Sequence, residues 1–382
     1  MKNKIFLEQL KILIKIFKQM GNYLDTPVID FNTSSIVIGS NFFVGTSIQG
    51  FRKTMEDRIL MTPLEYEETY LLAVFDGHGG EYVAEYLMKN ISSFLNGSEE
   101  LGRYIKNNDK SYMNLKNIIT NIFQDLDNKI YDYILRNERD INQGSTATMI
   151  LITNEDYIII NVGDSRSIIT NTSGSYVSSK DHKPILKEEE ERIINAGGSV
   201  SKDRVDGILA LSRAFGDFSY KRLFNNLDKI ISTPEIYITR KPNKKWIIIA
   251  SDGVWDSFTN EKLIEYIEYA YNNCENLLYQ DVMVERYNNR AEKLNEEFRK
   301  GMKITKVVKL PHKYLKKPTV LVSLPSDKDS QDFINDENEK IEIARFLSNQ
   351  LYRIKYITKK VIERAVELGS KDNISIIIGK LF

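Results

Sequence analysis

Two short apolar runs in the chain each lead into an Asp-Gly pair. Residues 71–75 (LLAVF) directly precede Asp76, and residues 246–250 (WIIIA) end two residues before Asp252. Apolar runs of this length, bounded by turn residues, predict buried β-strands. Each aspartate is therefore expected where a strand leaves the core, fixed in position but open to solvent.

A third aspartate has a related place near the C-terminus. Asp372 precedes the apolar run 374–378 (ISIII). If this strand runs antiparallel to the other two, Asp372 meets Asp76 and Asp252 at one end of the sheets. Three strand-end carboxylates that meet at one point would repel one another unless a cation lay between them. The pattern therefore predicts a metal centre.

The remaining pattern predicts both helices and strands. Periodicity and turn residues indicate helices at 81–94, 112–136, 188–196 and 344–368, strands at 42–44 and 149–152, a loop at 96–111, and a hairpin of 157–162 with 167–170. In the turn of that hairpin, Asp164 is either a further metal ligand or an Asx residue that stabilises the turn.

The chain is expected to hold an N-terminal segment and one main domain. Residues 1–40 comprise a basic amphipathic helix at 1–20 and a polar connector, and residues 41–382 form the domain. The helix is expected to pack on the domain, with contact to a membrane surface or a partner as the alternative. Lysine-rich and acidic stretches punctuated by proline predict an insertion at about 275–339.

Composition excludes several classes of function. Lys+Arg and Asp+Glu are both 53, which argues against a nucleic-acid binder. One cysteine, Cys274, permits neither an internal disulfide nor a cysteine zinc site and indicates a reducing intracellular compartment, cytoplasmic or nuclear, rather than secretion. With 3 histidines, a metal site must be mostly oxygen-ligated, which favours Mg²⁺ or Mn²⁺.

Several charged residues suit the hydrolysis of a phosphoester. Arg52 can bind phosphate through its planar fork of donors, and Glu56 and Asp57 can bind metal directly or through water, although each also fits ordinary surface charge. Two metal ions would clamp the phosphate and lower the pKa of a bridging water, which attacks phosphorus as hydroxide. His78 is a suitable proton donor to the leaving group.

Rival phosphate chemistries lack their required residues. A cysteine phosphatase needs an arginine six residues after its cysteine, and Gln280 stands there after Cys274. The chain also lacks the Asn-His-Glu tripeptide of the histidine-rich two-metal phosphatases and a P-loop.

The chain resembles the metal-dependent type 2C protein Ser/Thr phosphatase family. The motifs that carry the resemblance occur in the family's order over residues 45 to 376: Gly50-Phe51-Arg52 with Met55-Glu56-Asp57, Val74-Phe75-Asp76-Gly77-His78-Gly79-Gly80, Gly144-Ser145-Thr146-Ala147, Gly163-Asp164-Ser165-Arg166, Asp181-His182-Lys183-Pro184, Leu211-Ser212-Arg213-Ala214-Phe215-Gly216-Asp217, Ser251-Asp252-Gly253-Val254-Trp255-Asp256 and Lys371-Asp372-Asn373. Each tripeptide alone is a weak signal, but the ordered set is specific.

The resemblance implies a fold and a set of roles. The fold is an α+β, four-layer α/β/β/α sandwich of two antiparallel sheets flanked by helices, with a two-metal site at one end. The implied roles are a bridging ligand at Asp76, ligands at the Gly77 carbonyl, Asp252 and Asp372, metal or metal-bound water contacts at Glu56 and Asp57, a weaker third ion at Asp164 with Asp252, phosphate binding at Arg52 and general acid catalysis at His78. The substrates would be phosphoproteins, and the protein would act as a monomer.

The chain departs from the family pattern at a few places, and two other functions stay open. Asp206 stands where the family usually has asparagine, in a flap formed by residues 181–217, and the insertion and N-terminal helix are additional. The alternatives are a catalytically inactive scaffold of the same fold and a hydrolase of small phosphoesters.

Overall fold

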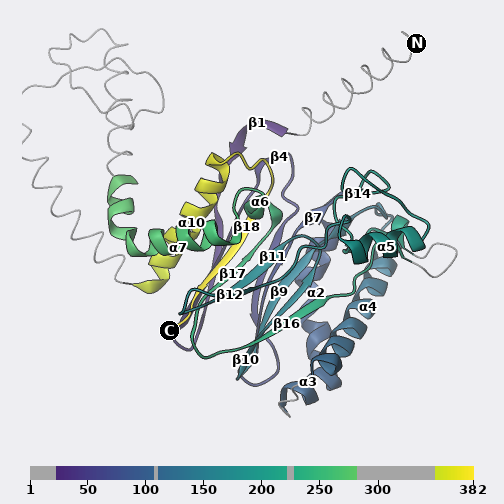
Figure 1. The fold of residues 1–382 in the computed structure, drawn as a ribbon, viewed down its shortest axis with the longest axis horizontal. Helices are drawn as coiled ribbons and strands as arrows, with labels where there is room; N and C mark the ends of the chain where they lie inside the picture. Colours follow the sequence, from purple (N-terminus) through teal and green to yellow (C-terminus); the bar gives the residue numbers. More distant parts are fainter. Residues whose placement is uncertain (1–22, 107–110, 222–227, 282–348) are drawn as a thin grey trace, which may run out of the picture. The chain divides into compact units, whose positions relative to one another are not determined.

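A computed structural model describes residues 23–106, 111–221, 228–281 and 349–382 (Figure 1). The chain divides into two compact units, Met1–Ile264 with Thr358–Phe382, and Glu265–Ile357. The predicted helix at 1–20 lies outside the described residues, as does the part of the predicted insertion from residue 282 onward.

Two antiparallel sheets form the first unit. One has five strands in the order β16-β10-β9-β6-β5 and the other six in the order β12-β11-β17-β18-β3-β2. The five-stranded sheet consists of β5 (Arg58–Pro63), β6 (Tyr70–Phe75), β9 (Ala147–Ile152), β10 (Asp156–Val162) and β16 (Glu235–Arg240). The six-stranded sheet consists of β2 (Asn32–Ile38), β3 (Asn41–Ile48), β11 (Arg166–Asn171), β12 (Tyr176–Ser178), β17 (Lys244–Ala250) and β18 (Ile374–Lys380).

Strand β6 shows why these strands read as continuous apolar runs. Its side chains alternate between two cores, because successive residues of a strand point to opposite faces. Leu72 and Val74 join the core between the sheets, with residues such as Ile247 and Ile377 from the facing sheet. Leu71, Ala73 and Phe75 join the core beneath the helices.

Two long helices cover the outer face of the five-stranded sheet (Figure 1). They are α2 (Tyr82–Asn96) and α4 (Tyr112–Arg136), and the short α3 (Glu99–Lys106) lies against both. Helix α2 buries Val83, Leu87 and Ile91, at the four-residue spacing of one helical face. Ser111 begins α4 by accepting a hydrogen bond from the Asn114 N–H at 3.2 Å.

Helices α6 and α10 belong to the side of the six-stranded sheet. Helix α6 (Asp252–Trp255) follows β17 directly, and Ser257 just after it donates a hydrogen bond to the Ala365 carbonyl of α10 (Gln350–Glu367). Val361 and Ile362 of α10 are fully buried. The fold is therefore the expected α+β sandwich of antiparallel sheets between helical layers.

Several smaller elements complete the first unit. They are the paired strands β1 (Tyr23–Val28) and β4 (Gly50–Arg52), the paired strands β13 (Val200–Ser201) and β14 (Arg204–Val205), the three-stranded sheet of β7 (Gly77–His78), β8 (Gly144–Ser145) and β15 (Phe215–Gly216), α5 (Lys187–Asn195), the 3₁₀ helix η1 (Phe218–Tyr220) and the start of α7 (Asn260–Asn272).

The second unit has its own small cluster among the described residues. Cys274 and Tyr356 are buried against Leu277 and Leu278. The Tyr356 hydroxyl donates to Asp281 at 2.7 Å. No helix in the described part of the chain is both long and apolar enough to cross a membrane.

Three local predictions are wrong. Residues 21–40 contain strands β1 and β2 rather than a connector, and β2 pairs with β3 throughout its length. Helix α3 forms inside the predicted loop at 96–111. Strands β10 and β11 do not form a hairpin, because they belong to different sheets and residues 163–165 carry the chain between them.

Candidate functional site

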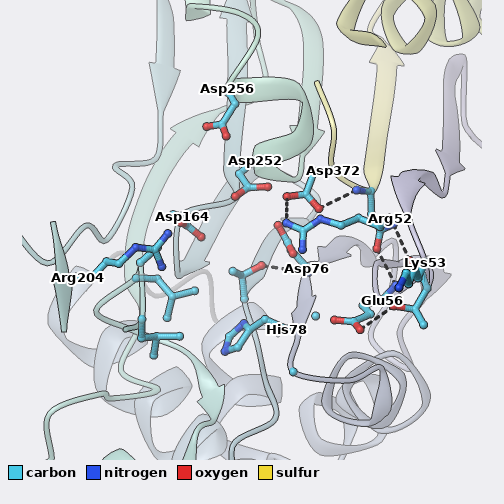
Figure 2. Close-up of a pocket in the computed structure, with 18 of the residues that line it drawn as sticks. Arg52, Lys53, Glu56, Asp76, His78, Asp164, Arg204, Asp252, Asp256 and Asp372 are labelled. Atoms are coloured by element: carbon cyan, nitrogen blue, oxygen red, sulfur yellow. Dashed lines mark hydrogen bonds and ion pairs between the residues drawn. The ribbon is translucent and has the colours of Figure 1, made fainter. Parts of the chain in front are cut away.

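The ends of three strands bring Asp76, Asp252 and Asp372 to one cavity (Figure 2). Asp76 follows β6 in one sheet, whereas Asp252 and Asp372 lie at the adjacent ends of the antiparallel strands β17 and β18. The cavity has a volume of about 650 Å³ and lies wholly within the first unit. The C-terminal strand β18 therefore runs antiparallel to β17, as the prediction for Asp252 and Asp372 required.

Two glycines allow the Asp372 segment to enter the site closely. A Cβ at Gly253 would lie 2.0 Å from the Asn373 carbonyl oxygen, and one at Gly50 would lie 2.2 Å from the Asp372 carbonyl oxygen. Gly50 also has a φ of +65°, which favours glycine. A side chain at either position would push Asp372 away from the other two aspartates.

Asn373 fixes the loop that carries Arg52 and Glu56. Its Nδ2 donates to the carbonyls of Gln49 and Thr54 at 2.8 and 2.9 Å, and its Oδ1 accepts from the Glu56 N–H at 2.8 Å. Both N–H donors and the carbonyl oxygen of this amide therefore join the start of β18 to the residues on either side of β4.

Crowding of carboxylates dominates the electrostatics of the cavity. Burial raises the pKa of Asp76 well above its usual value, and the neighbouring charges of Asp252 and Asp57 raise it further. Burial likewise raises the pKa of Asp252, with the charge of Asp164 adding to it. Burial raises the pKa of Asp57 to about 7. These acids lie where their negative charge is poorly compensated.

Two basic side chains each engage one acid at the edge of this group. Arg52 Nη2 lies 2.6 Å from Asp372 Oδ2, and Lys183 Nζ lies 2.5 Å from Asp164 Oδ2. The Nε of Arg52 is buried without a hydrogen-bond partner. Tyr23, paired with Arg52 across β1 and β4, places its ring 5.5 Å from the guanidinium. Arg52 thus keeps donor capacity available beside the acids.

The donor set fits hard divalent cations, although the side chains do not enclose one point. Within the described ranges, no three acidic, histidine or cysteine side chains stand in a ligating group. Asp372 and Asp164 instead face Arg52 and Lys183. The raised pKa values of Asp76 and Asp252 nevertheless show that carboxylates crowd together in the cavity. Carboxylate oxygens are the ligands that Mg²⁺ and Mn²⁺ prefer, so the site suits these ions.

His78 stands on the wall of the cavity and pairs with Asp217. Its Nε2 lies 2.7 Å from Asp217 Oδ2. Burial alone would lower the pKa of His78, but the facing carboxylate outweighs it, so that the pKa lies above its usual value. The contact with Asp217 therefore favours the protonated imidazole over the neutral one.

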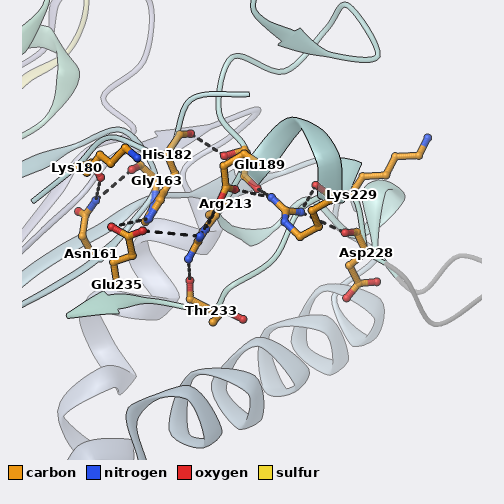
Figure 3. Close-up of polar contacts among 12 residues, drawn as sticks. Asn161, Gly163, Lys180, His182, Glu189, Arg213, Asp228, Lys229, Thr233 and Glu235 are labelled. Atoms are coloured by element: carbon orange, nitrogen blue, oxygen red, sulfur yellow. Dashed lines mark hydrogen bonds and ion pairs between the residues drawn. The ribbon is translucent and has the colours of Figure 1, made fainter. Parts of the chain in front are cut away.

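A network of buried hydrogen bonds and ion pairs lies next to the cavity residue Asp164 (Figure 3). Glu189 of α5 accepts hydrogen bonds from Arg192 Nη2 at 2.6 Å and from Arg213 Nε at 3.0 Å. His182 Nδ1 accepts the Gly163 N–H at 3.0 Å, and the His182 carbonyl accepts the Ser212 N–H at 2.9 Å. The network thus joins residues 163–165, which connect the two sheets, to the segment that leads from Ser212 to Asp217.

The unusual Asp206 has a defined place in the flap. Its Oδ1 accepts the Ser199 N–H at 2.9 Å, and its Oδ2 lies 2.8 Å from Lys229 Nζ. An asparagine could keep the first contact but not the ion pair. The change from the family pattern therefore adds a tether to the flap.

Most of the predicted site residues come together in the cavity. Those that line it are Arg52, Glu56, Asp76, Gly77, His78, Asp164, Asp252 and Asp372. Asp57 is 3% exposed and lies behind the wall, where its Oδ2 accepts from the Ser251 hydroxyl at 2.9 Å. The sequence did not point to Tyr23, Lys183, Asn373 or Asp217 as residues of the site. The last three stand inside quoted motifs, which was the available signal, whereas Tyr23 had none.

A family model described as protein phosphatase 2C matches residues 42–295. The chain belongs to the protein phosphatase 2C family. Metal dependence is general in this family. The model ends before Asp372 and begins after Tyr23, so both come to the site from outside the matched range.

Individual relatives agree with this assignment. The chain is 35% identical over 260 residues to "Protein phosphatase 1B" of Homo sapiens, covering 65% of this chain and 54% of that protein. It is 32% identical over 275 residues to "Probable protein phosphatase 2C 3" of Paramecium tetraurelia, covering 68% of this chain and 89% of that protein. The chain thus spans about half the length of the human relative and most of the other.

Solved structures support the fold. The serine-threonine phosphatase 2C of Toxoplasma gondii superposes with a TM-score of 0.58 at 16% identity, covering 94% of this chain and 98% of that chain. A C. elegans sex determining protein superposes with a TM-score of 0.55 at 19% identity, covering 92% of this chain and 65% of that chain.

Proposed function

We propose that the protein is a metal-dependent phosphatase that removes phosphate from phosphoserine and phosphothreonine in proteins. The observation that carries the proposal is the group of crowded carboxylates around Asp76 and Asp252, next to a phosphate-competent arginine and a histidine held by a carboxylate. Membership of the protein phosphatase 2C family supports the same reaction. The retained acids argue against an inactive scaffold.

The chain's own oxygen atoms would hold two Mg²⁺ or Mn²⁺ ions, with a weaker third. Asp76, the Gly77 carbonyl, Asp252 and Asp372 are the proposed ligands, and Glu56, Asp57 and Asp164 are the proposed outer contacts. When bound, the ions would supply positive charge for the phosphoryl group and lower the pKa of a nucleophilic water.

Arg52 and His78 would act on the substrate itself. The Arg52 guanidinium, held by Asp372 and flanked by Tyr23, would bind the phosphoryl oxygens through N–H donors that Asp372 does not engage. His78 would donate a proton to the leaving alkoxide, which departs poorly as an anion. Both residues line the same cavity.

Release of inorganic phosphate from a phosphothreonine peptide tests this function. The purified chain is assayed with Mn²⁺, with Mg²⁺ and with EDTA. We expect turnover with either metal, none in EDTA, and none for Asp76→Asn. If the folded protein releases no phosphate with either ion, the proposed function is wrong.

A further inference from the structure

We propose that Asp217 positions His78 for proton donation, and that His78 donates through Nδ1. The inference rests on the proposed function, which assigns the proton donor to His78 but gives Asp217 no role. Asp217 Oδ2 lies 2.7 Å from His78 Nε2, although the two residues are 139 positions apart in the chain. Since Nε2 is engaged by the carboxylate, Nδ1 is the nitrogen that remains for the leaving group.

The small sheet β7-β8-β15 brings the two residues together. His78 of β7 pairs with Gly144 of β8, and Gly144 pairs with Gly216 of β15, one residue before Asp217. A Cβ on Gly144 would lie 2.4 Å from His78 Nε2 and 2.3 Å from Asp217 Oδ2. The central strand therefore has glycine at the point where the histidine and the aspartate meet across it.

Asp217 is itself held firmly. Its side chain is 2% exposed, and its backbone has a φ of 52°, a left-handed conformation that is unfavourable for a non-glycine residue. Its N–H donates to the Gln143 carbonyl at 2.9 Å. A residue kept in such a conformation is fixed by its surroundings, which suits a group that must aim another.

A buried ion pair from α4 fixes the backbone just before Asp217. Asp127 Oδ1 accepts the Gly216 N–H at 2.8 Å, and Asp127 Oδ2 lies 2.7 Å from Lys221 Nζ. The same lysine donates to the Ala214 carbonyl at 2.8 Å. The aspartate that contacts His78 is thus anchored on both sides by the long helix.

This geometry sets the direction of proton transfer. The hydrogen bond from Nε2–H to Asp217 fixes the plane of the ring and holds one proton in place. As the P–O bond breaks, the Nδ1 proton passes to the leaving alkoxide oxygen, and the ring becomes neutral with Nε2–H still bonded to Asp217. Without the carboxylate, the ring would lose its orientation rather than its chemistry, so Asp217 is a positioning residue.

The dependence on the leaving group tests the proposal. An alkoxide needs a proton, whereas p-nitrophenolate leaves readily without one. For Asp217→Ala we expect kcat on a phosphothreonine peptide to fall about 10- to 100-fold and kcat on p-nitrophenyl phosphate to fall less than about threefold. His78→Ala should show the same pattern, and the double variant should be no slower than His78→Ala alone.

Asp206→Ala provides a matched control. Asp206 is also a flap aspartate at positive φ, but its carboxylate contacts Ser199 and Lys229 instead of His78. Its loss should leave the ratio of the two activities unchanged. Equal losses on both substrates for Asp217→Ala, or additive losses with His78→Ala, would overturn the role of Asp217. A wild-type protein that hydrolyses neither substrate would overturn the proposed function and this inference together.

A second measurement does not depend on turnover. The chain has 3 histidines, so ¹⁵N-histidine labelling gives few imidazole signals, and His78→Ala identifies the signals of His78. With EDTA present, we expect a hydrogen-bonded Nε2–H signal for His78 that disappears in Asp217→Ala and persists in Asp206→Ala. An unchanged His78 signal in Asp217→Ala would contradict the contact.

Discussion

The pKa values of two groups of buried carboxylates in this fold are shifted in opposite directions. In the network under the flap, burial alone would raise the pKa of Glu189, but Arg213 and Arg192 outweigh it and lower that pKa to about 2. In the cavity, burial and neighbouring carboxylates raise the pKa of Asp76 and Asp252 well above the usual value. The first group carries its compensating charge within the chain, and the second group does not.

The difference separates a structural role from a ligand-binding role. A paired buried acid holds the fold together, and losing it leaves its partner uncompensated. Acids that repel one another weaken the fold, and they persist where a cation from outside the chain binds them. Substitutions in the two groups should therefore change stability in opposite directions.

Asp76→Asn should produce the largest effect. We expect turnover on a phosphothreonine peptide to fall at least about 1000-fold, because the central ligand loses its negative charge and one of its two oxygen atoms. In EDTA the variant should nevertheless unfold at a higher temperature than the wild type, since one repelling charge is gone. Asp203→Asn, at an exposed turn position with positive φ, serves as the control and should change neither quantity. A lower unfolding temperature for Asp76→Asn in EDTA would contradict the comparison.

Glu189→Gln should have the opposite effect on stability. Removing this charge leaves Arg213 and Arg192 without their buried partner, and we expect the free energy of unfolding to fall by about 3 kcal/mol. Urea denaturation measures the change. The stabilisation from Glu189 should be fully present above about pH 4.5 and disappear as pH falls through about 2, since the folded pKa is depressed. A variant as stable as the wild type would show that the network is not structural.

Asp57 should show the reverse dependence on pH. Its pKa in the folded chain is about 7 against 3.8 for the ordinary group, so the folded state binds this proton more tightly. Its contribution to stability is therefore favourable below about pH 4 and is lost as pH rises through about 7. In EDTA, Asp57→Asn should be more stable than the wild type at pH 8 by about 1–3 kcal/mol, and the gap should close by pH 4. A gap that does not change with pH would refute the raised pKa.

Tyr23→Ala should produce the smallest effect. The ring of Tyr23 flanks the Arg52 guanidinium, a contact worth about 0.5–1 kcal/mol at an exposed site. We expect KM for the phosphopeptide to rise about two- to fivefold with little change in kcat. Tyr23→Phe keeps the ring and should behave as the wild type. If Tyr23→Phe is as impaired as Tyr23→Ala, the hydroxyl rather than the ring is what matters.

The sequence predicted the parts of the site that follow from strand patterns. Asp76, Asp252 and Asp372 each adjoin an apolar run, so their places at strand ends could be predicted, and α4 begins and ends where its periodicity indicated. Strand β2 was missed because it is an edge strand whose Thr33, Ser34 and Ser35 face solvent and give no apolar alternation.

The remaining errors concern contacts that no local pattern encodes. Gly163 to Ser165 has the composition of a hairpin turn, and only the pairing of β10 and β11 with different partners shows that it is a crossover between sheets. The contact of His78 with Asp217 depends on the register of three strands that are far apart in the chain. Local residue preferences set the elements, whereas such contacts come from tertiary packing.

Titration calorimetry of the wild-type protein with Mn²⁺ tests the central claim most directly. We expect binding of about two ions per chain, with release of protons because the raised pKa values of the cavity acids must fall on binding. Asp252→Asn should lose at least one ion, and Glu189→Gln, under conditions where it is folded, should keep both. Absence of binding, or equal binding by Asp252→Asn, would contradict the view that the poorly compensated charges of Asp76 and Asp252 serve to bind metal.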